Sequence, residues 1–178
     1  VRAMSDVARL PAAGLSDGMY ESFYLRAVNP DERVSIWIRF TVQKASGRPP
    51  KASIWFTVFD ESIGRPLARK ATSVPLEPEA GTDGWISIAD SVIGPRHTDG
   101  SFGDVSWSID ATASQGTLRH LPRGWMYHAP IPKTKPESPV PFARFSGSFE
   151  CGEPGGRISE ADRLGVAFGC DCCAETTS

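Results

Sequence analysis

Residues 34–59 have the sequence VSIWIRFTVQKASGRPPKASIWFTVF, in which two runs of alternating residues flank a loop that contains Gly and Pro. β-Branched and aromatic residues at every second position are the strongest indication of a strand that a sequence provides. The loop, residues 44–51, separates two such runs, so the stretch predicts an antiparallel hairpin. We expect the fold to be built on this hairpin.

The two faces of the predicted hairpin differ in chemistry. Successive side chains on a strand point to opposite faces, so the even positions form one apolar face. The odd positions place Trp37, Arg39, Trp55 and Phe59 on the other face, together with Ser and Thr hydroxyls. Large aromatic rings mixed with a charge are typical of the wall of an apolar cavity with a few polar anchors. The alternative is ordinary core or sheet-edge packing, with the stem of Arg39 covering an indole.

Further strand patterns recur at a spacing of roughly ten residues with turn signals between them, which favours an antiparallel sandwich or barrel. The strands are expected at residues 19–27, 66–73, 85–90, 105–111 and 143–149, and the last of these continues to about residue 152. In the first strand, Tyr20, Tyr24 and Arg26 share one face. Residues 97–103 are predicted to be a loop, and residues 118–139 are predicted to be irregular.

The pattern divides the 178-residue chain into three parts. Residues 1–18 are predicted to be a flexible leader, residues 19–152 a single β domain, and residues 153–178 a divergent tail. The tail is expected to be disordered or weakly helical, with its helix at residues 158–167.

Composition and motifs exclude several classes of function. A net charge of −2 gives no electrostatic footprint for nucleic acid or for an anionic membrane. No apolar run approaches the roughly 20 residues of a spanning helix, and the start has no secretory signal, so a cytoplasmic location is expected. The glycine-rich nucleotide motifs and the serine-hydrolase elbow are missing, and no cofactor is predicted.

The cysteines do not predict a metal site. Cys170, Cys172 and Cys173 crowd the tail, Cys151 lies far from them, and no second pair of ligands follows at a workable distance. The three histidines lie upstream in predicted loops, at positions 97, 120 and 128.

Glu21, Asp104 and Asp110 could serve acid–base work, and Glu21 is the one for which a catalytic role is argued. It falls on the apolar side of the first strand, where desolvation disfavours the charged form of a carboxyl, as suits a general acid. The alternative is an ion pair with Arg26 or Arg39, because buried charges are normally paired.

Three stretches carry a resemblance to a known family: residues 20–27 (YESFYLRA), residues 36–41 (IWIRFT) and residues 119–135 (RHLPRGWMYHAPIPKTK), continuing through Ser138-Pro139 to residues 143–147. Together they resemble the first half of carotenoid 1,2-hydratase (hydroxyneurosporene synthase) and tocopherol-cyclase-like proteins, over roughly residues 18–150. The resemblance implies a lipocalin-like β domain, the first of two, and an apolar ligand held within or between them.

The family's reactions are hydrations, cyclisations or cycloadditions of isoprenoid- or polyketide-like substrates. The residues after about 155 do not resemble the family's second domain, so a shifted reading frame or a truncated gene is expected there. The predicted fold is therefore all-β, an antiparallel lipocalin-like open barrel or half-sandwich with an irregular C-terminal tail.

Three functions follow as hypotheses. The first is the N-terminal domain of a hydratase- or cyclase-like protein that binds or converts an apolar small molecule, with truncation leaving it inactive. Its cavity is predicted to be lined by Tyr24, Trp37, Arg39 and Trp55, with Glu21 as a speculative acid. The second is a non-catalytic binder of lipid-like ligands, and the third is a carbohydrate-binding β-sandwich.

Overall fold

The hairpin of residues 34–59 forms as predicted and lies in the middle of a four-stranded antiparallel sheet, which we call sheet A. The computed structural model describes residues 19–73, 86–113, 116–129, 135–153, 156–160 and 166–168. Sheet A is a meander of consecutive strands: β1 (Met19–Asn29), β2 (Val34–Lys44), β3 (Lys51–Asp60) and β4 (Leu67–Ser73). Because each strand pairs with its neighbour in sequence, the sheet needs only short connections.

A second antiparallel sheet, sheet B, is formed by the later part of the chain. Its strands are β5 (Ile86–Ile88), β6 (Ser91–Ile93), β7 (His97–Phe102), β8 (Val105–Ala113), β11 (Phe142–Glu153), β12 (Gly156–Glu160) and β13 (Val166–Phe168). The order is β12-β11-β8-β7-β6-β5, and β13 pairs with β11 as well. The pairing of β8 with β11 joins the two halves of sheet B across the excursion described below.

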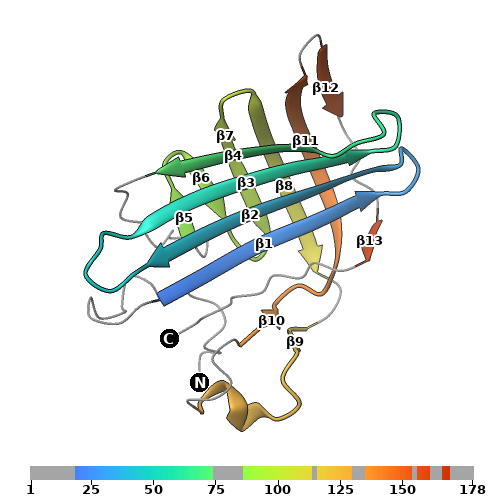
Figure 1. Ribbon diagram of the computed structural model, residues 1–178. Helices are drawn as coiled ribbons and strands as arrows, with labels where there is room; N and C mark the ends of the chain where they lie inside the picture. The colour runs from blue at the N-terminus through green and yellow to red at the C-terminus, as the bar shows by residue number, and fades with distance from the viewer. Residues whose placement is uncertain are drawn as a thin grey trace.

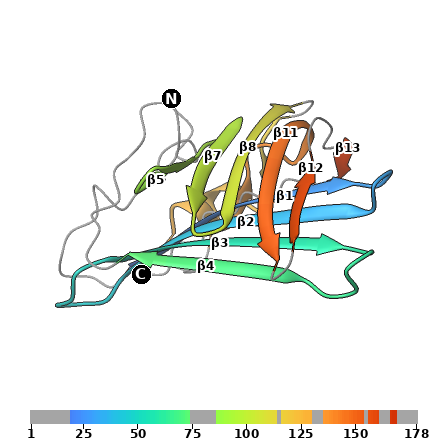
Figure 2. The same ribbon diagram turned by 90° about the horizontal axis from the view of Figure 1, so that it is seen from above.

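The two sheets stack face to face, and their strands cross at a steep angle (Figures 1 and 2). Such crossing is the orthogonal type of sheet packing. On β2 and β3 the even positions form the inner face of sheet A, and Ile36, Ile38, Phe40, Phe56 and Val58 are fully buried there. Sheet B therefore covers the aliphatic face of the hairpin, and the face that bears Trp37 and Trp55 is the outer one.

Trp107 on β8 is the centre of the contact between the sheets. Its ring stacks on Phe56 at 5.5 Å between centroids and meets Phe40 edge-on at 6.3 Å. Its indole Nε1 donates a hydrogen bond to Thr98 Oγ1 at 3.0 Å, and that hydroxyl donates to the carbonyl of Val92 at 2.9 Å. The one polar atom of this buried ring is thus paired, as a buried donor must be.

An arginine joins the two sheets at one rim. Arg69 of β4 donates from Nε and Nη2 to the carboxylate of Asp104, at 3.0 Å each to the nearer oxygen, and from Nη2 to the carbonyl of Gly152. Asp104 lies in the turn between β7 and β8. This ion pair therefore closes the side of the sandwich where β4 approaches sheet B.

Residues 118–129 and 135–138 form an excursion outside sheet B that extends beyond the lower end of the sandwich in Figure 1. It contains β9 (Leu118–Arg119), the short 3₁₀ helix η3 (Gly124–Tyr127) and β10 (Glu137–Ser138), and β9 pairs with β10. The hydroxyl of Tyr127 accepts from the amide of Leu121 and donates to the carbonyl of Pro136. A single buried ring thus holds the ends of the excursion together, and the prediction of an irregular stretch is largely confirmed.

Two predictions about secondary structure are wrong. Residues 97–102 were expected to be a loop but form β7, because β8 provides a regular partner that outweighs the poor strand propensities of Asp99 and Gly100. The helix expected at residues 158–167 is absent from its described ends, where β12 and β13 add to the edge of β11 instead. An unpaired strand edge offers backbone hydrogen bonds that a weak helix former cannot match.

The all-β, antiparallel fold is confirmed, and the sheets do not close into a barrel. The predicted leader, residues 1–18, and most of residues 153–178 lie outside the described residues.

Candidate functional site

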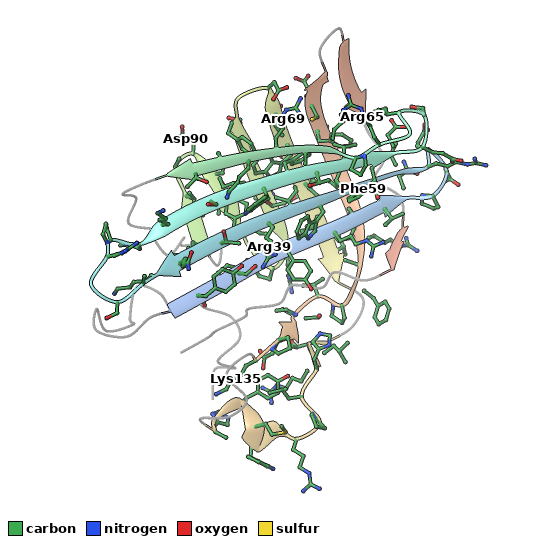
Figure 3. All side chains as sticks on the ribbon, viewed as in Figure 1. Arg39, Phe59, Arg65, Arg69, Asp90 and Lys135 are labelled. Atoms are coloured by element: carbon green, nitrogen blue, oxygen red, sulfur yellow. The ribbon has the colours of Figure 1, made fainter. Side chains whose placement is uncertain are left out.

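A groove of about 610 Å³ lies on the outer face of sheet A. This volume is within the range of small-molecule sites. Figure 3 shows Arg39 and Phe59 on the side of sheet A that is turned away from sheet B. The residues that line the groove come from β1, β2 and β3: Tyr24, Arg26, Ser35, Ile36, Trp37, Arg39 and Phe59.

The aromatic part of the groove is formed by Trp37 and Tyr24. Their rings meet edge to face, with centroids 6.5 Å apart and planes at 67°. The guanidinium of Arg39 lies 5.7 Å from the centroid of the Trp37 ring, within the range of a cation–π contact. The antiparallel register explains this grouping, because Tyr24 lies directly opposite Arg39 and Arg26 directly opposite Trp37.

Arg39 is fixed in orientation by two hydroxyls of β1. Its Nε donates to Ser22 Oγ at 2.8 Å, and its Nη2 donates to Tyr20 Oη at 2.6 Å. A guanidinium has five N–H groups, and the remaining three have no acceptor among the described residues. Ser22 is completely buried although it lies on the outer face, because the arginine covers it. The guanidinium of Arg39 is therefore fixed in orientation and still has N–H donors available for a ligand.

Trp55 lies on the same outer face but outside the groove. The ammonium of Lys70 sits over its ring, 4.1 Å from the centroid. Beside it, Ser53 Oγ and Thr72 Oγ1 are 3.0 Å apart and share a hydrogen bond. Of the four predicted cavity residues, Tyr24, Trp37 and Arg39 line the groove, whereas Trp55, directly opposite Arg39 in the register of β2 and β3, does not.

The surroundings of the two indoles differ from the enclosed hollow that the sequence indicated. Trp37 and Trp55 are both half-buried and lie on the surface of the sandwich. The space beside Trp37 is a groove on that surface. The two-residue alternation identifies which residues share a face, but both faces of this hairpin contain large apolar side chains, so the pattern alone does not determine which face the second sheet covers.

Glu21 lies on the opposite side of sheet A from the groove. Its side chain is 1% exposed and belongs to the inner face, as the sequence predicted. Arg26 and Arg39 are on the outer face, so the sheet separates Glu21 from both expected partners. Lys44, 5% exposed, shares the inner face and occupies a diagonal position in the register, because Glu21 lies opposite Val42. The geometry gives Glu21 no access to the groove.

Two further polar clusters among the described residues are weaker candidates for a functional site. His120 Nε2 and Ser138 Oγ are 2.8 Å apart, but Ser138 is fully buried, so its hydroxyl cannot reach a substrate. A shallower groove of about 370 Å³ on the outer face of sheet B is lined by serines and by Asp90, Asp99 and Glu150. No group of three or more His, Cys, Asp or Glu that could hold a metal ion occurs in the described ranges, which exclude Cys170, Cys172 and Cys173.

The clearest electrostatic perturbation lies at the rim of the sandwich and not in the groove. The hydrogen bonds from the Arg69 guanidinium lower the pKa of Asp104 below its usual value. A partner that favours the charged form of a carboxyl has this effect. The lowered pKa of Asp104 therefore bears on the stability of the fold and not on ligand binding.

Sequence reasoning placed Phe59 on the same face as Trp37 and Arg39, but it did not find the hydroxyls that hold Arg39, nor Arg26 and Ser35 as groove residues. The signal that could have identified these residues is the register of β1 against β2. Once β1 is paired with β2 so that Tyr24 faces Arg39, Ser22 becomes a diagonal neighbour of Arg39 and Tyr20 lies one step further along the same face.

Comparisons with protein-family models and with curated protein sequences gave no match. Among solved structures, the chain is similar to a crystal structure of a protein from Nitrosomonas europaea that is provisionally designated AttH. The TM-score is 0.50 at 14% identity, and the match covers 90% of this chain and 51% of the other. The chain thus spans about half the length of that protein, and the likeness concerns the fold alone. No helix in the described part of the chain has the length and apolar character needed to cross a membrane.

Proposed function

We propose that this chain binds an apolar, isoprenoid- or polyketide-like small molecule in the groove on the outer face of sheet A. The observation that carries the proposal is the groove itself, which combines a volume suited to such a ligand with an aromatic floor and one oriented polar anchor. Trp37 and Tyr24 supply the apolar contact area, and Arg39 supplies the polar group.

Binding without chemistry is favoured over hydration or cyclisation by this chain alone. None of the described residues that line the groove is an acid or a histidine. Glu21, the predicted acid, faces the other side of the sheet. The hydratase- or cyclase-like activity implied by the family resemblance would therefore need an acid or base from another part of the protein.

The arrangement of the two indoles argues against a carbohydrate platform. Sugar rings stack on open aromatic faces, but a cation sits over the Trp55 ring and another lies against the Trp37 ring. A sugar would have to displace these cations.

The test is titration of the full chain with Nile red, an uncharged apolar dye, in wild type and in Trp37→Ala. We expect the variant to bind about tenfold more weakly or worse, because a tryptophan that the ligand covers is a typical energetic anchor of a binding site. Trp125→Ala is the matched control, since Trp125 is 61% exposed on η3, away from the groove. Equal dye affinity in all three proteins would refute the groove as the site.

A further inference from the structure

All the charged side chains on the outer face of sheet A are cations. The outward positions of the four strands carry Arg26, Arg39, Lys51 and Lys70, and no Asp or Glu occurs among them. The chain as a whole has 21 acidic and 19 basic residues. The absence of acidic residues from this face is therefore a local property and does not follow from the overall composition of the chain.

None of these four cations has a carboxylate partner among the described residues. Four ion pairs among the described residues involve other cations: Arg33 with Glu61, Arg69 with Asp104, His97 with Asp110, and Arg119 with Glu137. Arg39 instead uses two neutral hydroxyls to fix its orientation. Neutral partners leave the full positive charge available to a ligand, which a carboxylate partner would not.

Two of the four cations line the groove. Arg26 lies directly opposite Trp37 in the register of β1 and β2, and Arg39 lies two residues beyond Trp37 on β2. An arginine whose stem and two N–H groups are already held loses less conformational entropy when it binds an anion, and its planar fork suits a carboxylate. The groove therefore combines an apolar wall with a pre-oriented anion site.

We propose that the ligand of this groove is a free apolar carboxylate, whose anionic oxygens bind Arg39 and Arg26 and whose hydrocarbon body packs against Trp37. This inference rests on the proposed function, because it specifies the ligand class of the same groove. A single-stranded nucleic acid is the less favoured occupant. Successive bases would need more than one open aromatic face, and Lys70 already sits over the ring of Trp55.

Matched pairs of ligands test the proposal. Isothermal titration of the full chain with retinoate and retinol, and with oleate and oleyl alcohol, compares equal hydrocarbon bodies that differ in the anionic group. We expect each acid to bind about tenfold more tightly than its alcohol, as a charge-assisted hydrogen bond would provide. We also expect the preference to shrink as salt is raised, because the arginines lie at the surface.

Variants assign the preference to residues. Arg39→Gln and Arg26→Gln should each reduce affinity for the acid by more than they reduce affinity for the alcohol, and Arg48→Gln, in the loop after β2, should change neither. The side chain of Arg26 is exposed and has no hydrogen bond or ion pair among the described residues, so its variant remains informative if Arg39→Gln does not fold.

Each alternative outcome has a distinct meaning. Equal binding of acid and alcohol, both weakened by Trp37→Ala, would overturn the carboxylate and leave the proposed function intact. Failure of every acid and alcohol to bind would overturn both. Tighter binding of a single-stranded oligonucleotide or of phosphatidylserine vesicles than of the monomeric acids, lost in Arg39→Gln, would replace the small carboxylate with that partner.

Discussion

The inner and outer faces of sheet A are built on the same strands yet have opposite chemistry. On the inner face, the side chains from Val34 to Val42 and from Ala52 to Val58 are aliphatic or aromatic and almost wholly buried under sheet B. On the outer face, alternate residues of the same strands carry indoles, hydroxyls and cations around a groove. The outer face therefore differs from an ordinary solvent-exposed face, although its sequence contains polar residues. Its large aromatic rings are half-buried by neighbouring side chains on the same face.

The sharpest test of this contrast compares two adjacent residues. Phe56 is fully buried against Trp107, whereas Trp55 points outward under Lys70. We expect Phe56→Ala to lower the free energy of unfolding by about 3–5 kcal/mol, because it leaves a cavity in the core. Trp55→Ala should cost only about 1 kcal/mol. Urea unfolding of the two variants measures both values, and similar losses would contradict the assignment of the faces.

The second prediction concerns polar groups on the buried side of the sandwich. Thr98→Val removes the acceptor of the Trp107 indole while keeping the shape of the side chain. Leaving a buried donor unpaired should lower the free energy of unfolding by about 1–3 kcal/mol. Thr72→Val is the control, since Thr72 is exposed and its hydroxyl bonds to Ser53 on the outer face. A larger loss in the control than in Thr98→Val would contradict the prediction.

The third prediction concerns the cation over Trp55. Lys70→Gln should lower the free energy of unfolding by only about 0.5–1 kcal/mol, as expected for an exposed cation–π contact. The same substitution in a Trp55→Ala background should have almost no effect, so a double-mutant cycle isolates the contact. An unchanged cost in that background would show that the lysine acts through another group.

The smallest expected effect is at the rim, where Asp104 contacts Arg69. The pKa of Asp104 is lowered in the folded state, so its ion pair contributes stability above the pKa of an unfolded Asp, about 3.9. That contribution is lost as the pH falls through the lower folded value. Asp104→Asn should therefore be less stable than wild type near pH 7 and equal to it in strong acid.

Arg69→Gln provides the control for the rim, since it removes the cause of the shift. In that background, Asp104→Asn should change the unfolding midpoint by the same small amount at both pH values. A pH-dependent difference that persists without Arg69 would show that another group perturbs Asp104.

Most of sheet A could be predicted from sequence, because β2 and β3 alternate strictly and their loop contains Gly and Pro. Strand β7 could not, since its regularity comes from pairing with β8 rather than from its own residues. The grouping of Tyr24, Trp37 and Arg39 in one site could be predicted from their residue types and from their positions on one face of the sheet. The location of that site outside the sandwich did not, because nothing local in β2 specifies which of its two faces sheet B will cover.

The meander order of sheet A has a consequence for synthesis. Residues 19–73 contain all four strands, so this sheet can pair completely while later residues are still within the ribosome. Its inner face, with Phe40 and Phe56, would then be exposed to water until β8 and β11 arrive. During that interval the nascent chain exposes an apolar surface that is buried in the folded protein, and we expect chaperones to bind mainly to that surface.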